Sequence, residues 1–399
     1  MLLDFIVISM TMIFVIPLLV IGFELLITLF HKSMMASGEV TAELQGTYKI
    51  LMPAHNEAGI IGKTISGFLK QSISPDCILV VADNCTDNTA EIVKGLGVTV
   101  LERVDAMQRG KGFALDYGID YLKENVQPEV VIVLDADCEI DTSSLNLLVT
   151  DCLKKKCPVQ GLYLMRHSAS VSLNQRVAGF AWLVKNKIRP IAVNKLGLPV
   201  TLTGTGMAFP WHVITNVNVG HGNIVEDMQL GIDCTLNGFA PVFCEEAVVY
   251  SDFPEQVKAE KTQRTRWEHG HLATIIQQVP TLFKQAIGRR DWHLLGLALD
   301  IGVPPLSLLV MLSLISGVIL SAYSFMTGVY TPLFIFLASF LFFIGLLVAT
   351  WWQFGREYLT VKELCSIPVY IISKLSVYAA FIFKRQTSWV KTSRNKKDD

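Results

Sequence analysis

The chain has 399 residues, of which 51% are hydrophobic and only 17% are charged. Soluble domains usually carry about 25% charged residues, so this composition predicts membrane segments and excludes a disordered chain, a collagen-like chain and a small disulfide scaffold. The 34 basic and 35 acidic residues give a net charge of -1. This balance provides no electrostatic basis for binding nucleic acid, so membrane lipids and a small molecule are the expected partners.

The first predicted element is an apolar run from Phe5 to Phe30, in which Glu24 is the only acidic residue. Its length exceeds the roughly 20 residues that a helix needs to cross a bilayer. A cleaved signal peptide is the alternative interpretation, but no basic residue precedes the run and no small-residue cleavage site follows it. We therefore expect a retained transmembrane helix within residues 1–35.

The next part of the chain, residues 45–275, carries most of the charge and alternates between two kinds of apolar pattern. Short apolar runs typical of β-strands alternate with segments whose apolar residues recur at helical spacing. Strands are expected near 49–53, 77–82, 98–101 and 130–134, and helices near 60–69, 86–93 and 111–122. This alternation predicts an α/β domain with a parallel sheet covered by helices. Ligands of such sheets bind beyond the carboxyl ends of the strands.

Polar clusters follow three of these strands directly: His55-Asn56-Glu57, Asp83-Asn84 and Asp135-Ala136-Asp137. In an extended segment, Asp135 and Asp137 point to the same side of the backbone. Two carboxylates with open coordination positions suit a Mg²⁺ or Mn²⁺ ion that phosphates also bind. An ordinary polar turn is the alternative interpretation of this spacing.

Two further clusters lie downstream. Glu226 and Asp227 open a predicted helix, where carboxylates can also serve only to cap the helix. Gln263 and Arg266 are three residues apart on a predicted helix, with Trp267 beside them. An arginine can bind phosphate oxygens and an indole can stack on a sugar ring, so this segment is a candidate binding site. The alternative interpretation is a solvated basic helix end with a tryptophan in the core.

The last part of the chain is again apolar. An interfacial helix is expected within 276–293, two transmembrane helices within 294–353 (Leu295 to Tyr323, kinked at Pro304-Pro305, and Pro332 to Trp352), and an interfacial helix with a basic tail within 362–399. Lysine and arginine accumulate on the cytoplasmic side of membrane proteins. Three spans place the basic clusters, the large domain and the C-terminus in the cytoplasm, whereas a fourth span at Leu364 to Phe383 does not.

The eight cysteines contain no Cys-x-x-Cys pair. A zinc site is therefore not expected, and on the cytoplasmic side the thiols stay reduced. We interpret all eight as buried small apolar residues.

The ordered motifs resemble those of a family 2 glycosyltransferase over roughly residues 45–275. They are Pro53-Ala54-His55-Asn56-Glu57, Asp83, Lys111, Asp135-Ala136-Asp137, Thr203-Gly204-Thr205-Gly206, Glu226-Asp227 and Gln263-x-x-Arg266-Trp267. The set is similar to the D, DxD, ED and QxxRW motifs of the cellulose, hyaluronan and chitin synthase branch. The resemblance implies a cytoplasmic GT-A domain between transmembrane helices, with a mostly parallel sheet and helices on both faces.

The resemblance also implies a role for each motif. The uridine part of a UDP-sugar would contact Asp83 and the turn containing Pro53, Ala54, Asn56 and Glu57. Lys111 and Arg266 would lie near the diphosphate, and Asp135 and Asp137 would bind Mg²⁺ or Mn²⁺. Asp227 would be the general base with Glu226 as its neighbour. The acceptor would contact Gln263, Trp267 and the loop of Thr203, Gly204, Thr205 and Gly206.

The implied activity is inverting transfer of a sugar from a UDP-sugar by a membrane-embedded, metal-dependent enzyme. The acceptor is either a growing polysaccharide, which QxxRW favours, or a lipid-linked glycan extended once, which the few spans favour. An export or assembly protein is a possible partner. A nucleotidyltransferase, a catalytically silent scaffold and a polyprenol-phosphate sugar synthase are the remaining alternatives, although the last usually lacks QxxRW.

Overall fold

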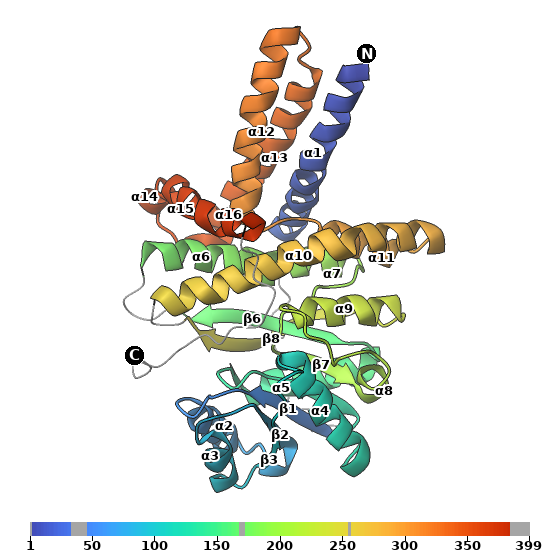
Figure 1. Ribbon diagram of the computed structural model, residues 1–399, viewed down its shortest axis with the longest axis vertical. Helices are drawn as coiled ribbons and strands as arrows, with labels where there is room; N and C mark the ends of the chain where they lie inside the picture. Colours follow the sequence, from blue (N-terminus) through green and yellow to red (C-terminus); the bar gives the residue numbers. More distant parts are fainter. Residues whose placement is uncertain (1, 33–45, 167–171, 254–256, 384–399) are drawn as a thin grey trace. The chain divides into compact units, whose positions relative to one another are not determined.

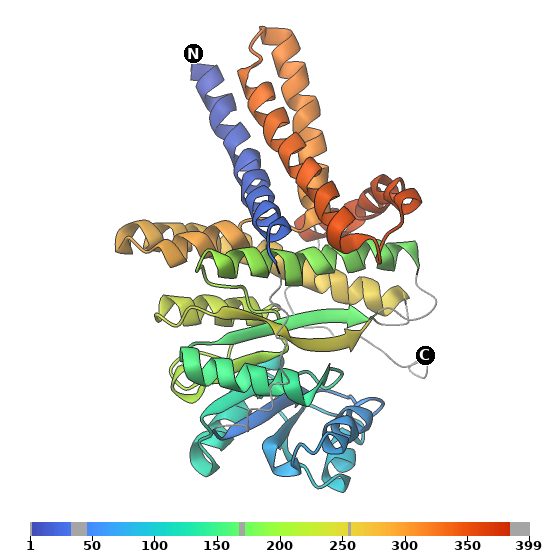
Figure 2. The ribbon, with the colours of Figure 1, turned by 180° about the vertical axis from the view of Figure 1, so that it is seen from behind.

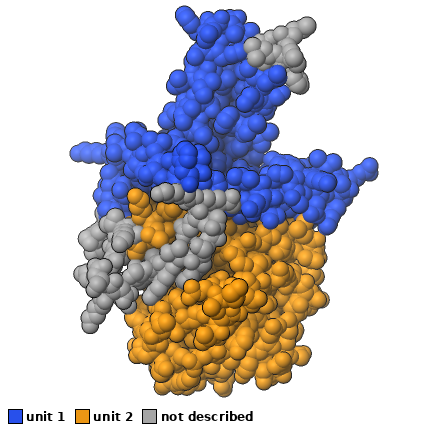
Figure 3. Space-filling model, in the orientation of Figure 1, with its two compact units in different colours: residues 1–32, 170–196, 271–385 blue, residues 33–169, 197–270, 386–399 orange. Residues whose placement is uncertain are grey.

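The computed structural model describes residues 2–32, 46–166, 172–253 and 257–383. The chain divides into two compact units, coloured separately in Figure 3. Unit 1 comprises 1–32, 170–196 and 271–385, and unit 2 comprises 33–169, 197–270 and 386–399. Residues 170–196, which the sequence grouped with the α/β domain, cluster with the long apolar helices instead. The basic tail from residue 384 lies outside the described residues.

Unit 2 is built on one mixed sheet of eight strands among the described residues, in the order β3-β2-β1-β4-β7-β6-β8-β5. β1 pairs in parallel with β2 and β4, β2 with β3, and β6 with β8. β7 is antiparallel to β4 and β6, and β5 to β8. The strands are β1 (Tyr48–Ala54), β2 (Ile78–Asp83), β3 (Thr99–Arg103), β4 (Val130–Val133), β5 (Glu139–Ile140), β6 (Val159–Arg166), β7 (Met207–Pro210) and β8 (Val242–Asp252).

Helices cover both faces of this sheet, because the central strands are apolar on both sides. Every residue of β2 and β4 is buried. α4 (Lys111–Asn125) packs on one face, where Gly118 approaches so closely that a Cβ atom there would lie 2.4 Å from Leu51 Cδ1. α5 (Thr142–Lys155) covers the opposite face, as Figures 1 and 2 show. The prediction of an α/β domain with helices on both faces of the sheet is confirmed, although the sheet is mixed because β7 and β5 pair antiparallel with their neighbours.

The remaining helices of unit 2 are short, apart from the beginning of α10. They are α2 (Ile61–Lys70), α3 (Thr89–Gly95), α8 (Trp211–Ile214) and α9 (Glu226–Leu236), with a 3-10 turn at Pro75–Cys77. The sequence predicted the early strands and helices to within a few residues. Because β1, β2 and β4 are parallel neighbours, the polar segments that follow them lie at one edge of the sheet.

Unit 1 contains three helices that are long and apolar enough to cross a membrane, counting the described residues only: Ile6–Leu29, Leu306–Thr327 and Thr331–Gly355. They correspond to α1 (Leu2–Leu29), α12 (Leu306–Thr327) and α13 (Thr331–Thr350) continued by a π-helical turn, Trp351–Gly355. α1 packs against α13, where a Cβ atom on Gly22 would lie 2.6 Å from the Phe342 ring. The number of expected spans is therefore confirmed by length and composition.

Two details of the expected apolar segments are wrong. The run from Leu295 to Tyr323 is not one kinked helix, because the chain breaks at Pro304-Pro305 into α11 (Trp292–Ile301) and α12. Proline lacks the backbone donor and restricts the residue before it, which ends the helix. The helix expected near 276–293 is also not separate, since α10 (Val257–Arg289) runs through most of that range.

The fourth apolar stretch forms three short helices: α14 (Val361–Leu364), α15 (Ile367–Ser373) and α16 (Leu375–Phe383). None has the roughly 20 residues that a spanning helix requires. Their short length supports the expected interfacial position, which remains a prediction.

A buried ion network connects three helices of unit 1. It centres on Arg189, the first residue of α7 (Arg189–Lys195), which follows α6 (Leu173–Leu183) and a π-helical turn at Val184–Ile188. Arg189 Nε lies 2.6 Å from Glu24 Oε2 in α1, and its Nη2 lies 2.6 Å from Asp300 Oδ1 in α11. The only acidic residue of the first apolar run is thereby paired.

Candidate active site

A cavity of about 400 Å³ opens at the carboxyl ends of β1, β2 and β4. It is lined by residues of five of the predicted motifs, together with the chain preceding α4. The lining residues are Pro53, Ala54, His55, Glu57, Asp83, Asn84, Arg109, Gly110, Lys111, Ala114, Asp135, Ala136, Asp137, Gln263 and Arg266. The structure therefore brings together side chains that are more than 200 positions apart in the sequence.

The Asp83 side of the cavity is fixed by a buried ion pair. Arg103 Nη1, at the end of β3, lies 2.7 Å from Asp83 Oδ1, and both side chains are 9% exposed. Arg103 also donates to the Gln108 carbonyl at 2.8 Å and to Asp105 at 3.2 Å. These bonds attach the loop before α4 to Asp83. The sequence analysis missed Arg103, although an arginine at the end of an apolar strand is itself an unusual feature.

Asn56 does not line the cavity, although the sequence analysis assigned it to the nucleotide. Its Oδ1 accepts from the backbone N–H of Thr86 at 2.6 Å and of Asp87 at 3.3 Å. Asn56 also has a φ of 54°, which asparagine adopts more readily than most residues. Its side chain therefore shapes the loop after β2, while its neighbours His55 and Glu57 line the cavity.

Lys111 connects four of the predicted motifs. Its Nζ lies 2.5 Å from Asp135 Oδ1, 2.6 Å from the Gly204 carbonyl oxygen and 3.8 Å from Glu226 Oε1. Burial opposes its charge, but Asp135 and Glu226 outweigh burial and raise the pKa of Lys111 above its usual value. Lys111 is therefore a cation among carboxylates, with a side chain that is only 16% exposed.

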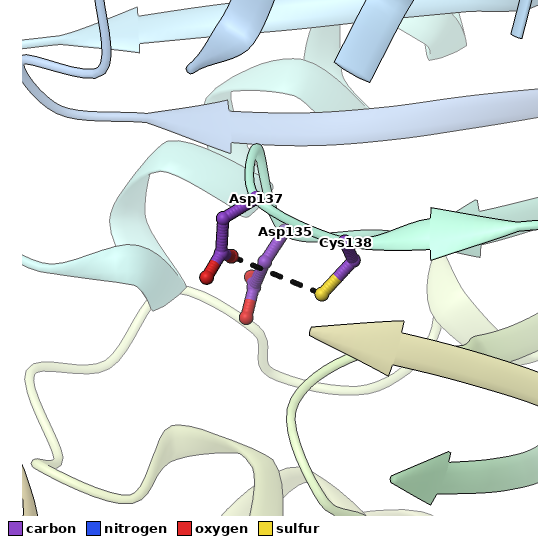
Figure 4. A group of neighbouring side chains, drawn as sticks. All are labelled: Asp135, Asp137 and Cys138. Carbon is purple, nitrogen blue, oxygen red and sulfur yellow. Dashed lines mark hydrogen bonds between the residues drawn. The ribbon is translucent and has the colours of Figure 1, made fainter. Parts of the chain in front are cut away.

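Asp135 and Asp137 follow β4 in the predicted position for metal ligands. Their carboxylates and the Cys138 thiol have candidate ligand atoms within 4.8 Å of one another, as Figure 4 shows. Burial raises the pKa of the Cys138 thiol well above its usual value, so the sulfur stays protonated. A hard divalent cation prefers oxygen ligands, so the two carboxylates fit Mg²⁺ or Mn²⁺ and the thiol does not.

The pair Glu226 and Asp227 opens α9, as predicted. Burial and the neighbouring Asp227 raise the pKa of Glu226 to about 7, although Lys111 opposes this shift. A Cβ atom on Gly204 would lie 3.3 Å from Asp227 Oδ2, so the predicted acceptor loop contacts this pair. Neither carboxylate lines the cavity itself; they are linked to it through Lys111 and Gly204.

The QxxRW segment lies at the beginning of α10. Gln263 is buried and lines the cavity together with Arg266, whereas Trp267 does not line it. A Cβ atom on Gly270 would lie 2.6 Å from Val225 Cγ1. The helix that carries QxxRW therefore packs directly against the residue that precedes Glu226.

Six lining residues were not among the predicted site residues: His55, Asn84, Arg109, Gly110, Ala114 and Ala136. Arg109 is two positions before Lys111, so its place in a basic loop before a predicted helix was the available signal. All eight cysteines are free, but the interpretation of every cysteine as buried holds for only four of them. Cys365 is exposed, and three others are half-buried: Cys77, Cys85 and Cys157.

Comparison with known families agrees with this geometry. A family model described as "Glycosyltransferase like family 2" matches residues 46–270, which is more than half of the chain. The chain therefore belongs to this family of glycosyltransferases.

Two curated relatives show where the similarity extends. The probable glycosyltransferase YdaM of Bacillus subtilis is 26% identical over 253 residues, covering 59% of this chain and 57% of the relative. The poly-beta-1,6-N-acetyl-D-glucosamine synthase of Staphylococcus epidermidis is 24% identical over 259 residues, covering 63% and 61%. The chain thus spans about three fifths of the length of these relatives.

Among solved structures, a mannosyltransferase from Pyrobaculum calidifontis in complex with GDP-mannose and Mn²⁺ is similar with a TM-score of 0.49 and 15% identity, covering 86% of this chain and 99% of that one. Glucosyl-3-phosphoglycerate synthase from Mycobacterium tuberculosis, in complex with Mn²⁺, UDP-glucose and glycerol 3-phosphate, is similar with a TM-score of 0.39 and 20% identity, covering 60% and 84%.

Proposed function

We propose that this glycosyltransferase transfers a sugar from a UDP-sugar to a growing exopolysaccharide, with inversion at the anomeric carbon. The observation that carries the proposal is the position of Lys111. It connects Asp135, at the cavity, with Glu226 and the Gly204 loop, which contacts Asp227. One lysine thus links the candidate leaving-group side of the site to the candidate proton acceptor.

A divalent cation bound by Asp135 and Asp137 would neutralise negative charge on the diphosphate of the donor. The fit of these residues rests on charge, because Asp135, Glu226 and Asp227 interact with a single ammonium group, that of Lys111, and Asp137 adds a further carboxylate beside Asp135. Lys111 and Arg266 supply positive charge toward the same diphosphate, where negative charge develops as the sugar leaves. Asp83 and the turn after β1 are then left to bind the uridine.

Asp227 is the proposed general base, with Glu226 as its neighbour. A base must accept the proton of the acceptor hydroxyl as that hydroxyl attacks the anomeric carbon. The hydroxyl oxygen forms the new bond on the face opposite the departing UDP, so the configuration inverts and no sugar–enzyme bond forms. Gln263, Trp267 and the loop from Thr203 to Gly206 are proposed to bind the acceptor.

The polysaccharide acceptor is favoured by the similarity to poly-beta-1,6-N-acetyl-D-glucosamine synthases and by the QxxRW segment. A lipid-linked sugar extended once is the alternative. In either case the proposed location is the membrane, with three spans and the catalytic unit in the cytoplasm, where the lysine and arginine clusters are expected. An export partner is part of this proposal only if a polymer is made.

Product size tests the choice of acceptor. The purified full chain in detergent is given a panel of UDP-sugars, including UDP-N-acetylglucosamine, with Mn²⁺, and Asp227→Asn serves as the blank. A ladder of long products from one donor supports the polysaccharide synthase. A single added sugar that requires a lipid-linked acceptor contradicts it and supports the alternative.

A further inference from the structure

Gln160, in β6, is a buried amide that no motif assigns to the site. It is 1% exposed, and its side chain bonds to both sides of Gly204. Oε1 accepts from the Thr203 backbone N–H at 2.9 Å, and Nε2 donates to the Thr205 carbonyl oxygen at 2.9 Å and to the Gly161 carbonyl oxygen at 2.8 Å. The amide therefore holds the two residues that flank Gly204, Thr203 and Thr205.

The loop of residues 203–205 contacts three parts of the candidate site. The Thr205 hydroxyl accepts from the backbone N–H of Asp135 at 3.1 Å, and Thr205 is completely buried. The Gly204 carbonyl oxygen accepts from Lys111 Nζ at 2.6 Å, and the Gly204 Cα lies beside Asp227. The position of the loop therefore determines how the aspartates of two motifs face Lys111.

The bonds from Gln160 are not duplicated by the sheet. Strand β7 begins at Met207, and the residue before it, Gly206, donates its backbone N–H to the Val133 carbonyl oxygen at 3.0 Å. Gly204 has a φ of +91°, a conformation that side-chain-bearing residues rarely adopt. Residues 203–205 thus lie outside the strand, and Gln160 bonds to them there.

We propose that Gln160 is a positioning residue for sugar transfer, which acts by fixing the Thr203–Thr205 loop against Asp135, Lys111 and Asp227. This inference rests on the proposed function of the site. An amide is required because the loop presents one N–H and one carbonyl oxygen to the same side chain. Glutamate would place a carboxylate oxygen against the Thr205 and Gly161 carbonyl oxygens, and leucine would leave these buried backbone groups unpaired.

The test compares Gln160→Leu and Gln160→Glu with Gln71→Leu in the full-length protein. Gln71 is the matched control, because its amide also bonds to two backbone groups, the Thr142 N–H and the Ile140 carbonyl oxygen, without contacting the loop. Hydrogen exchange of residues 203–205 is measured without metal, together with UDP binding, and sugar transfer is measured with Mn²⁺.

We expect both Gln160 variants to accelerate exchange at residues 203–205 and to lower kcat by about 10–100-fold, the range typical of residues that orient ligands of a metal site. Metal-free binding of UDP is expected to change less than kcat, because the residues proposed to bind the uridine, Asp83 and the turn after β1, belong to other segments of the chain than residues 203–205. If Gln160→Leu does not yield folded protein, Gln160→Glu, which has nearly the same volume, decides the outcome.

A kcat equal to that of Gln71→Leu, in a Gln160 variant whose loop exchanges faster, would overturn the inference. So would unchanged exchange at residues 203–205. A wild-type protein that transfers no sugar from any donor would contradict the proposed function instead, and the exchange measurement would still decide whether Gln160 fixes the loop.

Discussion

The ammonium of Lys111 lies 2.5 Å from a carboxylate oxygen of Asp135. Replacing Lys111 by methionine removes the cation that lies within 4 Å of both Asp135 and Glu226. We therefore expect kcat to fall by about 10²–10³-fold, as when one group that stabilises developing charge is removed. The apparent affinity for Mn²⁺ is expected to rise, because the carboxylates lose a competing positive charge.

A Mn²⁺ titration of sugar transfer measures both effects. Lys94→Met is the control, since Lys94 makes a 2.6 Å ion pair with Glu102 on the surface of unit 2. Weaker apparent Mn²⁺ binding in Lys111→Met than in Lys94→Met would contradict the idea that the Lys111 ammonium competes with Mn²⁺ for the carboxylates.

The raised pKa of Glu226 predicts how stability depends on pH in the metal-free protein. Burial first, and Asp227 second, raise this pKa from 4.5 to about 7. Between these pH values the folded protein keeps a proton that the unfolded chain has lost, so stability falls as the pH rises from about 4.5 to 7. Glu226→Gln has no such proton, and we expect its unfolding to depend less on pH in this window. The free energy of unfolding of both proteins is measured by chemical denaturation at several pH values. An equal dependence on pH in the two proteins would refute the raised pKa of Glu226.

The buried pair of Arg103 and Asp83 predicts a combined effect on stability and donor binding. Arg103→Leu leaves the Asp83 carboxylate buried without its ion pair, which typically costs about 3–5 kcal/mol. We also expect a higher KM for the UDP-sugar, because the loop before α4 loses its attachment to Asp83. Arg103→Lys, which keeps the charge, is the matched comparison in thermal unfolding and kinetics. An Arg103→Leu protein with unchanged stability and KM would exclude this role.

The ion network around Arg189 predicts a rescue. Arg189→Met leaves Glu24 and Asp300 buried without their shared cation, so the packing of α1, α7 and α11 is expected to be destabilised. Neutralising both carboxylates as well, in Arg189→Met with Glu24→Gln and Asp300→Asn, is expected to restore much of the stability. Limited proteolysis in detergent compares the variants, and a triple variant less stable than Arg189→Met would contradict the network.

The sequence predicted the parallel half of the sheet well, because the early strands are short apolar runs, each followed by polar residues. It also predicted Asp83 and Asp135 at one edge of the sheet, since parallel strands bring the segments that follow them together. The place of Lys111 in the site was an expectation from the family resemblance alone. The antiparallel strand β7 and the break at Pro304-Pro305 depend on packing and backbone geometry that periodicity does not report. Arg103 and Gln160 were missed because their importance lies in the groups they bond to, which only the fold brings together.

The measurement that tests the central claim most directly is transfer of a labelled sugar by the wild-type protein, Asp227→Asn and Asp233→Asn. Both residues lie in α9, but Asp233 bonds to Gln229 within the same helix. We predict that Asp227→Asn loses about 10²–10⁴-fold in kcat, the usual contribution of a general base, and that Asp233→Asn does not. The wild-type product should carry the sugar with inverted configuration and release UDP. Equal activity of the two variants, or a product that retains the phosphate of the donor, would contradict the account.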